Sequence, residues 1–116
     1  MAQTGRHLEL RTNGNNLILR YNDGSAENNQ KPAADVLLRT AAESLERSVI
    51  SVVLTGMGSD GAAGTKKVRE MGGITIAQDE KSSLIYGMPK AAVETGCVDM
   101  ILPLEQIPEK IIRLLK

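Results

Sequence analysis

Seven residues in the middle of the chain, with the sequence Thr-Gly-Met-Gly-Ser-Asp-Gly at 55–61, combine three glycines with a single ionisable side chain, Asp60. They follow an uninterrupted apolar run at 49–54, which predicts a strand buried on both faces of a parallel sheet. Ligands and chemistry gather at the carboxyl ends of such strands. Glycines let the backbone turn sharply and approach another group closely. The pattern therefore predicts a functional loop whose chemical group is the Asp60 carboxylate.

Spacing alone also favours a structural role for Asp60. The side chain stands just before a helix-like segment, where an N-cap aspartate would accept from the backbone N–H of Ala62 or Ala63. Such a cap contributes about 1 kcal/mol to stability. A capping aspartate can still present an oxygen to a partner, so the two roles are compatible.

Residues 56–61 also fit the pattern G-x-G-x-x-G, which binds the pyrophosphate of dinucleotides when it lies between a strand and a helix. Asp79 and Glu80 lie about twenty residues further on, where an acid that binds the ribose is expected. Against this interpretation, the carboxylate of Asp60 would repel the diphosphate. Nucleotide binding remains an alternative function.

The chain offers few other reactive groups. It contains one histidine, His7, and one cysteine, Cys97, so neither a cluster of metal ligands nor an internal disulfide is expected, and no cofactor is predicted. A triad of Ser59, His7 and Asp60 would need two adjacent residues to flank one imidazole, which is poor relay geometry. We expect His7 to be a surface or structural residue.

Length and composition predict one domain over residues 1–116. Lys and Arg balance Asp and Glu at 14 each, and aromatic residues make up only 2% of the chain, which argues against nucleic-acid binding. No apolar run is long enough for a membrane span. The lone cysteine suits a reducing compartment, and we expect a cytoplasmic protein.

Two patterns of apolar residues divide the chain. Residues 1–31 predict a β-hairpin, because leucines alternate with polar residues on both sides of a turn at Asn13-Gly14, followed by a polar loop at 22–31. Residues 32–116 alternate between helical and strand patterns. Strands are expected over 49–54, 74–77 and 98–102. Helices are expected from Pro32, over 61–71, from Gly87 to about Glu94 and from Pro103. The last helix would carry Ile107, Ile111, Ile112 and Leu115 on one side. This order predicts an α/β fold, a doubly wound, mostly parallel three-layer sheet with an N-terminal hairpin.

The loop and its surroundings resemble the catalytic domain of the bacterial chemotaxis protein-glutamate methylesterases. The resemblance is carried by Val-Val-Leu-Thr-Gly-Met-Gly-Ser-Asp-Gly-Ala-Ala-Gly at 52–64 and by Tyr-Gly-Met-Pro-Lys-Ala-Ala at 86–92. Asp35, in the segment that follows Pro32, also matches, and the similarity covers nearly all of the chain in order.

The resemblance implies hydrolysis of glutamyl methyl esters, and deamidation of glutamines, on the cytoplasmic domains of chemoreceptors. It implies a Ser-His-Asp triad in which Asp60 is the aspartate and the backbone N–H of Met57 is an oxyanion donor. The family's binding loops correspond to Thr55, Gly56, Gly58, Gly87 and Met88.

The family's serine and catalytic histidine lie upstream of the matched segment, and His7 does not correspond to that histidine. We therefore expect the C-terminal part of a methylesterase domain that is inactive alone. A non-catalytic module that binds chemoreceptors, a missing N-terminal half, or a second copy of itself is the alternative, because absent strands would leave an apolar face or edge exposed.

Overall fold

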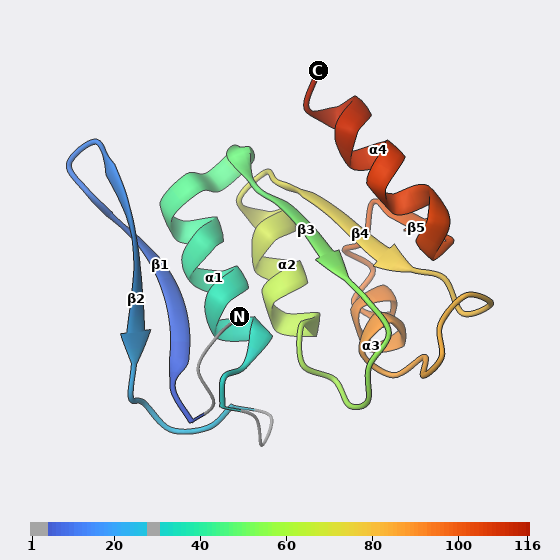
Figure 1. Cartoon of the computed structure of the whole chain (residues 1–116), viewed down its shortest axis with the longest axis horizontal. Coiled ribbons are helices and arrows are strands. Elements are labelled where there is room, and N and C mark those ends of the chain that lie inside the picture. The colour runs from blue at the N-terminus through green and yellow to red at the C-terminus, as the bar shows by residue number, and fades with distance from the viewer. Residues whose placement is uncertain (1–4, 28–30) are drawn as a thin grey trace.

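The computed structural model describes residues 5–27 and 31–116, and its elements form a two-stranded hairpin beside a three-stranded sheet with helices (Figure 1). The elements, in chain order, are β1 (His7–Asn13), β2 (Asn16–Asn22), α1 (Ala34–Leu45), a 3₁₀ turn (Glu46–Ser48), β3 (Ile50–Val53), α2 (Ala62–Glu70), β4 (Ile74–Gln78), α3 (Met88–Glu94), β5 (Met100–Leu102), a second 3₁₀ turn (Leu104–Gln106) and α4 (Ile107–Leu114). The predicted alternation of helices and strands after residue 32 is confirmed.

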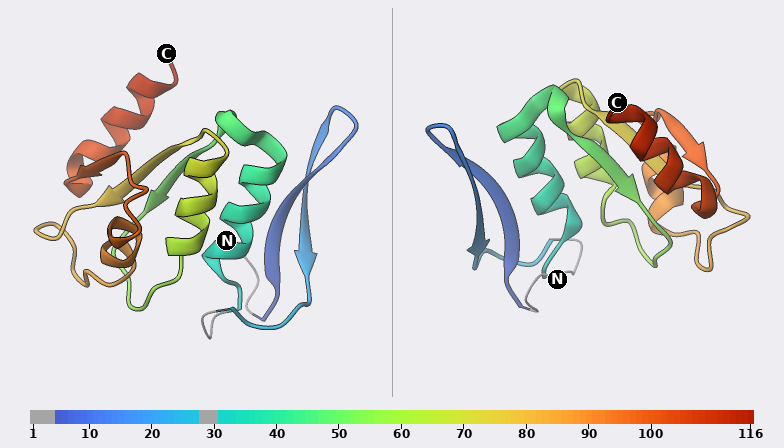
Figure 2. Two further views of the ribbon diagram at one scale, coloured as in Figure 1. Left: turned by 180° about the vertical axis from the view of Figure 1, so that it is seen from behind. Right: turned by 45° about the horizontal axis from the view of Figure 1, so that its top comes forward.

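The sheet has the order β3-β4-β5, and both pairs of strands are parallel. Val52 pairs with Ile76, which in turn pairs with Met100. Helices α2 and α3 lie on one face of the sheet and α4 lies on the other (Figure 2). The prediction of a doubly wound, parallel α/β fold is therefore confirmed.

A buried apolar cluster lies where α1 and α2 pack together beside the start of β3. Ala42, Val49 and Val68 are buried at its centre. Around them pack the half-buried side chains of Leu38, Ala41, Leu45 and Met71. In the sequence, residues 38, 41, 42 and 45 recur at helical spacing, which predicts this packed face of α1.

The apolar run at 49–54 predicted a strand buried on both faces, but β3 is buried on only one. Ser51 and Val53 are buried on the side of α1 and α2, but Ile50 and Val52 are only half-buried and Leu54 is 43% exposed. The reason is that the helices on this side of the molecule cover only one face of the strand (Figure 2).

The last helix also differs from its prediction. A 3₁₀ turn precedes it, so α4 begins at Ile107 rather than at Pro103. Ile107 is 4% exposed and Ile111 is half-buried, whereas Ile112 and Leu115 are 55% and 73% exposed. Part of the apolar side of α4 therefore remains exposed to solvent.

The hairpin packs through its edge. The N–H of Leu10 donates to Thr40 Oγ1 at 2.9 Å, and Ser44 Oγ donates to the carbonyl of Leu10 at 3.0 Å, so α1 closes the open edge of β1. The predicted hairpin is confirmed, although pairing of Asn13 with Asn16 places the two-residue turn one position later than expected, at 14–15. In the polar loop predicted over 22–31, residues 28–30 lie outside the described part of the chain.

Candidate active site

Asp60 lies in the loop that joins β3 to α2, at the carboxyl edge of the sheet, and is 8% exposed. Its Oδ2 accepts from the N–H of Ala34 at 2.6 Å, and its Oδ1 accepts from the N–H of Asp35 at 3.0 Å. These are the first two N–H groups of α1, which have no acceptor within their own helix. The positive end of the helix dipole favours a carboxylate there.

Asp60 therefore caps a different helix from the one expected. The N-cap position of α2 is occupied by Gly61, whose φ of 100° lies in the left-handed region. The carboxylate that serves α2 belongs to Asp35, whose Oδ1 accepts from the N–H groups of Gly61 at 3.0 Å and Gly64 at 2.7 Å. Capping between neighbouring helices depends on tertiary contact, so the local pattern after Asp60 suggested the wrong helix.

Met57 is exposed in this loop, with 78% of its surface accessible. Within the described part of the chain, its backbone N–H donates no hydrogen bond. Gly58, which follows it, has a φ of 94°. The use of the Met57 N–H as an oxyanion donor remains a prediction.

The loops after β3 and β4 are joined to each other. The N–H of Gly56 donates to the carbonyl of Ile85 at 3.0 Å, and the carbonyl of Gly56 accepts from the N–H of Met88 at 2.8 Å. The hydroxyl of Thr55 donates to the carbonyl of Ile85 at 3.0 Å and accepts from its N–H at 2.8 Å. The structure thus brings together Thr55, Gly56, Gly87 and Met88, which the sequence had placed at binding loops.

At Gly87 the backbone of the neighbouring loop leaves no room for a side chain, whereas at Gly56 only the Met88 side chain stands in the way. A Cβ on Gly87 would lie 2.7 Å from the carbonyl oxygen of Gly56 and 3.0 Å from the nitrogen of Gly58. A Cβ on Gly56 would lie 2.6 Å from Sδ of Met88. These glycines pack the loops, and any direct contact with a ligand remains a prediction.

Gln78 supports the same loops and was not singled out from the sequence. Its side chain is fully buried at the end of β4. Oε1 accepts from the N–H of Thr55 at 2.8 Å, while Nε2 donates to the carbonyl of Ser82 at 2.8 Å. A polar residue at the end of a mostly apolar strand was the signal available for it.

His7 is buried and has a structural role, within the expectation from the sequence. It is 1% exposed. Nε2 lies 2.8 Å from the carbonyl of Ser25, so this nitrogen carries the proton, and Nδ1 accepts from the N–H of Ala33 at 3.2 Å. The ring joins the loop after β2 to the start of α1.

A buried charge interaction lies in the hairpin, away from the loop of Asp60. Glu9 is 3% exposed and accepts from Arg20 Nε at 2.7 Å and Asn22 Nδ2 at 3.1 Å. Hydrogen bonds from Arg20, and then from Asn22, lower the pKa of Glu9 to about 2, against the opposing effect of its burial. Glu9 therefore holds the two strands together as a carboxylate.

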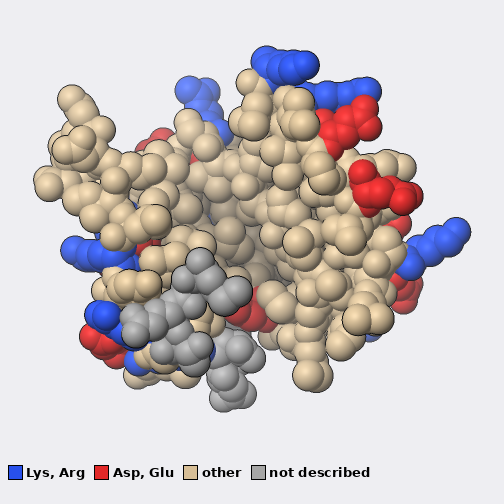
Figure 3. All heavy atoms as spheres, viewed as in Figure 1, with Lys and Arg blue, Asp and Glu red and all other residues tan. Residues whose placement is uncertain are grey.

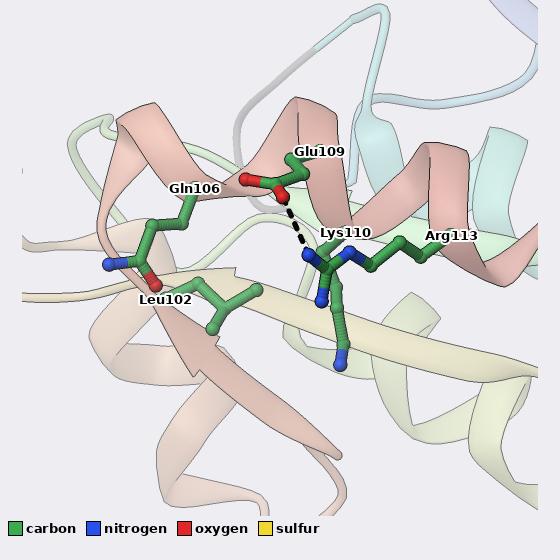
Figure 4. Close-up of a pocket in the computed structure, with 5 residues that line it drawn as sticks. All are labelled: Leu102, Gln106, Glu109, Lys110 and Arg113. Carbon is green, nitrogen blue, oxygen red and sulfur yellow. Dashed lines mark hydrogen bonds and ion pairs between the residues drawn. The ribbon is translucent and has the colours of Figure 1, made fainter.

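Figure 4 shows a cleft of about 340 Å³ between α4 and the end of β5. It is lined by Leu102 and by side chains of α4 and the turn before it, among which Arg113 Nη2 and Glu109 Oε1 form an ion pair at 2.8 Å. None of the predicted site residues lines this cleft.

Over residues 5–27 and 31–116, no group of three His, Cys, Asp or Glu side chains is placed to hold a metal ion. Nor does any helix in that part of the chain have the length and apolar character needed to cross a membrane.

Solved structures place this arrangement in a known class. The crystal structure of the Thermotoga maritima CheB methylesterase catalytic domain matches 95% of this chain with a TM-score of 0.92 and 40% sequence identity, and the match covers 58% of that chain. The fold is therefore that of a methylesterase catalytic domain over the matched region.

Sequence comparison identifies the family. The sequence profile of the family described as CheB methylesterase matches residues 1–111, and the chain belongs to this family. A protein-glutamate methylesterase/protein-glutamine glutaminase of Pyrococcus abyssi is 49% identical over 107 residues, 92% of this chain and 29% of the relative. The Hydrogenovibrio crunogenus protein of the same name is 45% identical over the whole chain and 31% of its own length. The chain thus spans about 30% of the length of these curated relatives.

Proposed function

We propose that this chain is the aspartate-bearing part of a cytoplasmic protein-glutamate methylesterase and protein-glutamine glutaminase that acts on chemoreceptors. The observation that carries the proposal is the placement of Asp60, a buried carboxylate held by two backbone N–H groups at the carboxyl edge of a parallel sheet. Close beside it in sequence, the backbone N–H of Met57 donates no hydrogen bond within the described part of the chain, which leaves it able to donate to an oxyanion.

In the proposed reaction, a serine hydroxyl attacks the ester carbonyl while an imidazole takes the serine proton. Asp60 accepts a hydrogen bond from the other imidazole nitrogen, fixes the tautomer and stabilises the imidazolium. The Met57 N–H donates to the oxyanion of the tetrahedral intermediate. The imidazolium then protonates the leaving group, which departs as methanol from an ester or as ammonia from a glutamine. Water hydrolyses the acyl-enzyme by the reverse sequence of proton transfers.

The serine and the imidazole must come from polypeptide outside these residues, and the surface around β3 supports such an arrangement. Among the described strands, β3 has β4 as a neighbour on one side and no strand on the other. Its outward residues Ile50 and Val52 are half-buried, and the centre of this face of the molecule carries no Lys, Arg, Asp or Glu (Figure 3). An open apolar strand edge favours pairing with another segment.

A docking role without catalysis is the second candidate, and exposed apolar side chains in the loops at the carboxyl edge favour it. Leu84 is 91% exposed and Ile85 is 47% exposed, in the loop that is joined to the Gly56 turn. Such a surface could bind a chemoreceptor or a second copy of this chain even where no reaction takes place.

The test is to measure methanol release from a methylated chemoreceptor cytoplasmic fragment with the pure chain, and again after adding the remaining, serine-containing segment of a methylesterase domain. We expect no hydrolysis by the chain alone and hydrolysis by the mixture. Hydrolysis by the chain alone, or none by a mixture that forms a stable complex, would refute the proposal. Receptor binding without hydrolysis in the complex would establish the docking role. NAD and ATP serve as controls, and we expect neither to raise the melting temperature.

A further inference from the structure

We infer that Asp35 is a positioning residue for Asp60 and for the loop that carries Met57. The inference rests on the proposed function, because it concerns the placement of the proposed catalytic aspartate. Its carboxylate bonds to the backbone at the start of α2, which immediately follows Asp60 in the chain, and acts on Asp60 through that backbone.

The two aspartates cap each other's helices. Asp60, at the end of the loop before α2, accepts from the N–H groups of Ala34 and Asp35 at the start of α1. Asp35, in the first turn of α1, accepts from Gly61 and Gly64 at the start of α2. Both carboxylates are buried, at 8% and 3% exposure. Four backbone N–H groups that lack acceptors within their own helices are thereby satisfied by two side chains.

The close approach of the two helix starts makes this arrangement specific. A Cβ on Gly64 would lie 2.5 Å from Cβ of Leu38 and 3.1 Å from Oδ1 of Asp35, so only glycine lets α2 come this near to α1. Two helix N-termini side by side present like partial positive charges. The carboxylates of Asp35 and Asp60 lie between them and offset that repulsion.

Asp35 therefore determines where Asp60 stands. The N–H that Asp35 holds at 3.0 Å belongs to Gly61, the residue next to Asp60, and the N–H that it holds at 2.7 Å lies three residues further on. Without these acceptors the start of α2 can shift, and Asp60 shifts with it. A displacement of about 1 Å in a catalytic group lowers the rate by about 10²-fold.

Amide hydrogen exchange in the 116-residue chain tests the coupling without reference to catalysis. The probe is the Ala34 N–H, which donates to Oδ2 of Asp60. We expect Asp35→Ala to speed its exchange about tenfold or more, whereas Asp35→Asn, which keeps an acceptor oxygen, restores protection. Asp99→Ala is the matched control, because Asp99 also accepts from a backbone N–H, that of Thr75. Both residues are distant from Ala34 in the sequence.

Exchange of the Ala34 N–H that is no faster in Asp35→Ala than in Asp99→Ala would overturn the inference. If Asp35→Ala does not fold, Asp35→Glu replaces it, since the longer side chain keeps the charge and moves the oxygens. Unchanged protection in that variant would also overturn the inference.

Kinetics of the domain completed with its serine-containing segment provide the second readout. We expect Asp35→Ala to lower kcat for ester hydrolysis about 10²-fold with little change in KM, and Asp35→Asn to recover most of the loss. A rise in KM alone, or equal loss in the Asn and Ala variants, would contradict a positioning role. If the completed wild-type domain is inactive, the proposed function fails, while the exchange experiment still decides whether Asp35 positions Asp60.

Discussion

Replacing Gly87 with alanine tests how the Met57 turn is held. Gly87 stands at the start of α3, and a Cβ there would point into the backbone of the neighbouring loop. It would lie 2.7 Å from the carbonyl oxygen of Gly56, 3.0 Å from the nitrogen of Gly58 and 3.2 Å from Cα of Met57. All three atoms belong to the backbone, so no side chain can rotate away to make room.

The size of the effect follows from these distances. An ordinary contact begins near 3.4 Å, so the loop or α3 must move by about 0.7 Å (3.4 − 2.7) to accept the methyl group. Overpacking of this kind costs about 1–3 kcal/mol. The φ of Gly87 is −103°, which alanine adopts readily, so the substitution also gains about 0.4–1 kcal/mol by restricting the unfolded chain. We expect a net loss of about 1–2 kcal/mol in the free energy of unfolding.

Urea denaturation followed by circular dichroism measures this loss. Gly24→Ala is the control, because a Cβ at Gly24 would meet only the Asn22 side chain, and we expect a change within about 0.5 kcal/mol. In the completed domain, Gly87→Ala should also lower kcat, since the oxyanion donor moves with the loop. A Gly87→Ala variant as stable as the wild type would refute the view that glycine is needed for this packing.

Three further substitutions test other parts of the structure. Because the folded state holds the pKa of Glu9 near 2, below its ordinary 4.5, the stability it contributes is present above pH 4.5 and is lost as the pH falls toward 2. Glu9→Gln should flatten the pH dependence of the free energy of unfolding in that window. The difference should be less than about 3 kcal/mol, because the guanidinium partners are partly exposed, and an unchanged profile would contradict the assignment. Ile76→Val should cost about 0.5–1.5 kcal/mol at a fully buried site, whereas Ile101→Val, at 51% exposure, should cost less, and equal losses would place the core elsewhere. Gln78→Leu removes the buried amide that accepts from the Thr55 N–H and should cost about 1–3 kcal/mol by urea denaturation, so no loss would show that the bond is unimportant.

The fold was largely predictable, because local patterns specify its elements. Alternating leucines around Asn13-Gly14 identified the hairpin, and helical spacing in α1 identified its packed face. The errors arose where burial depends on distant neighbours. The apolar run of β3 suggested two covered faces, and Ile112 in α4 suggested a buried side chain. In both cases the residues are apolar, but the described elements around them leave that face partly exposed.

The candidate site was predictable in its membership and only partly in its connections. The glycines and Asp60 stand out within one loop, and the resemblance drew attention to Gly87. The partner of Asp60 was missed, because a cap across two helices joins residues about 25 positions apart. Gln78 was missed for the same reason, because its side chain bonds to loops that follow two different strands.

The most direct test of the proposed role of Asp60 is the kcat for methyl ester hydrolysis by the completed domain with Asp60→Asn. Asparagine keeps one of the two acceptor oxygens that hold the start of α1, so we expect the fold to persist with some loss of stability, as circular dichroism can verify. It no longer holds the imidazole in the required tautomer, and loss of that function in other triads lowers kcat by about 10⁴-fold. A loss of that order with the fold retained is the expected result. A folded Asp60→Asn domain with a kcat within a few fold of the wild type would show that this carboxylate has no part in the reaction.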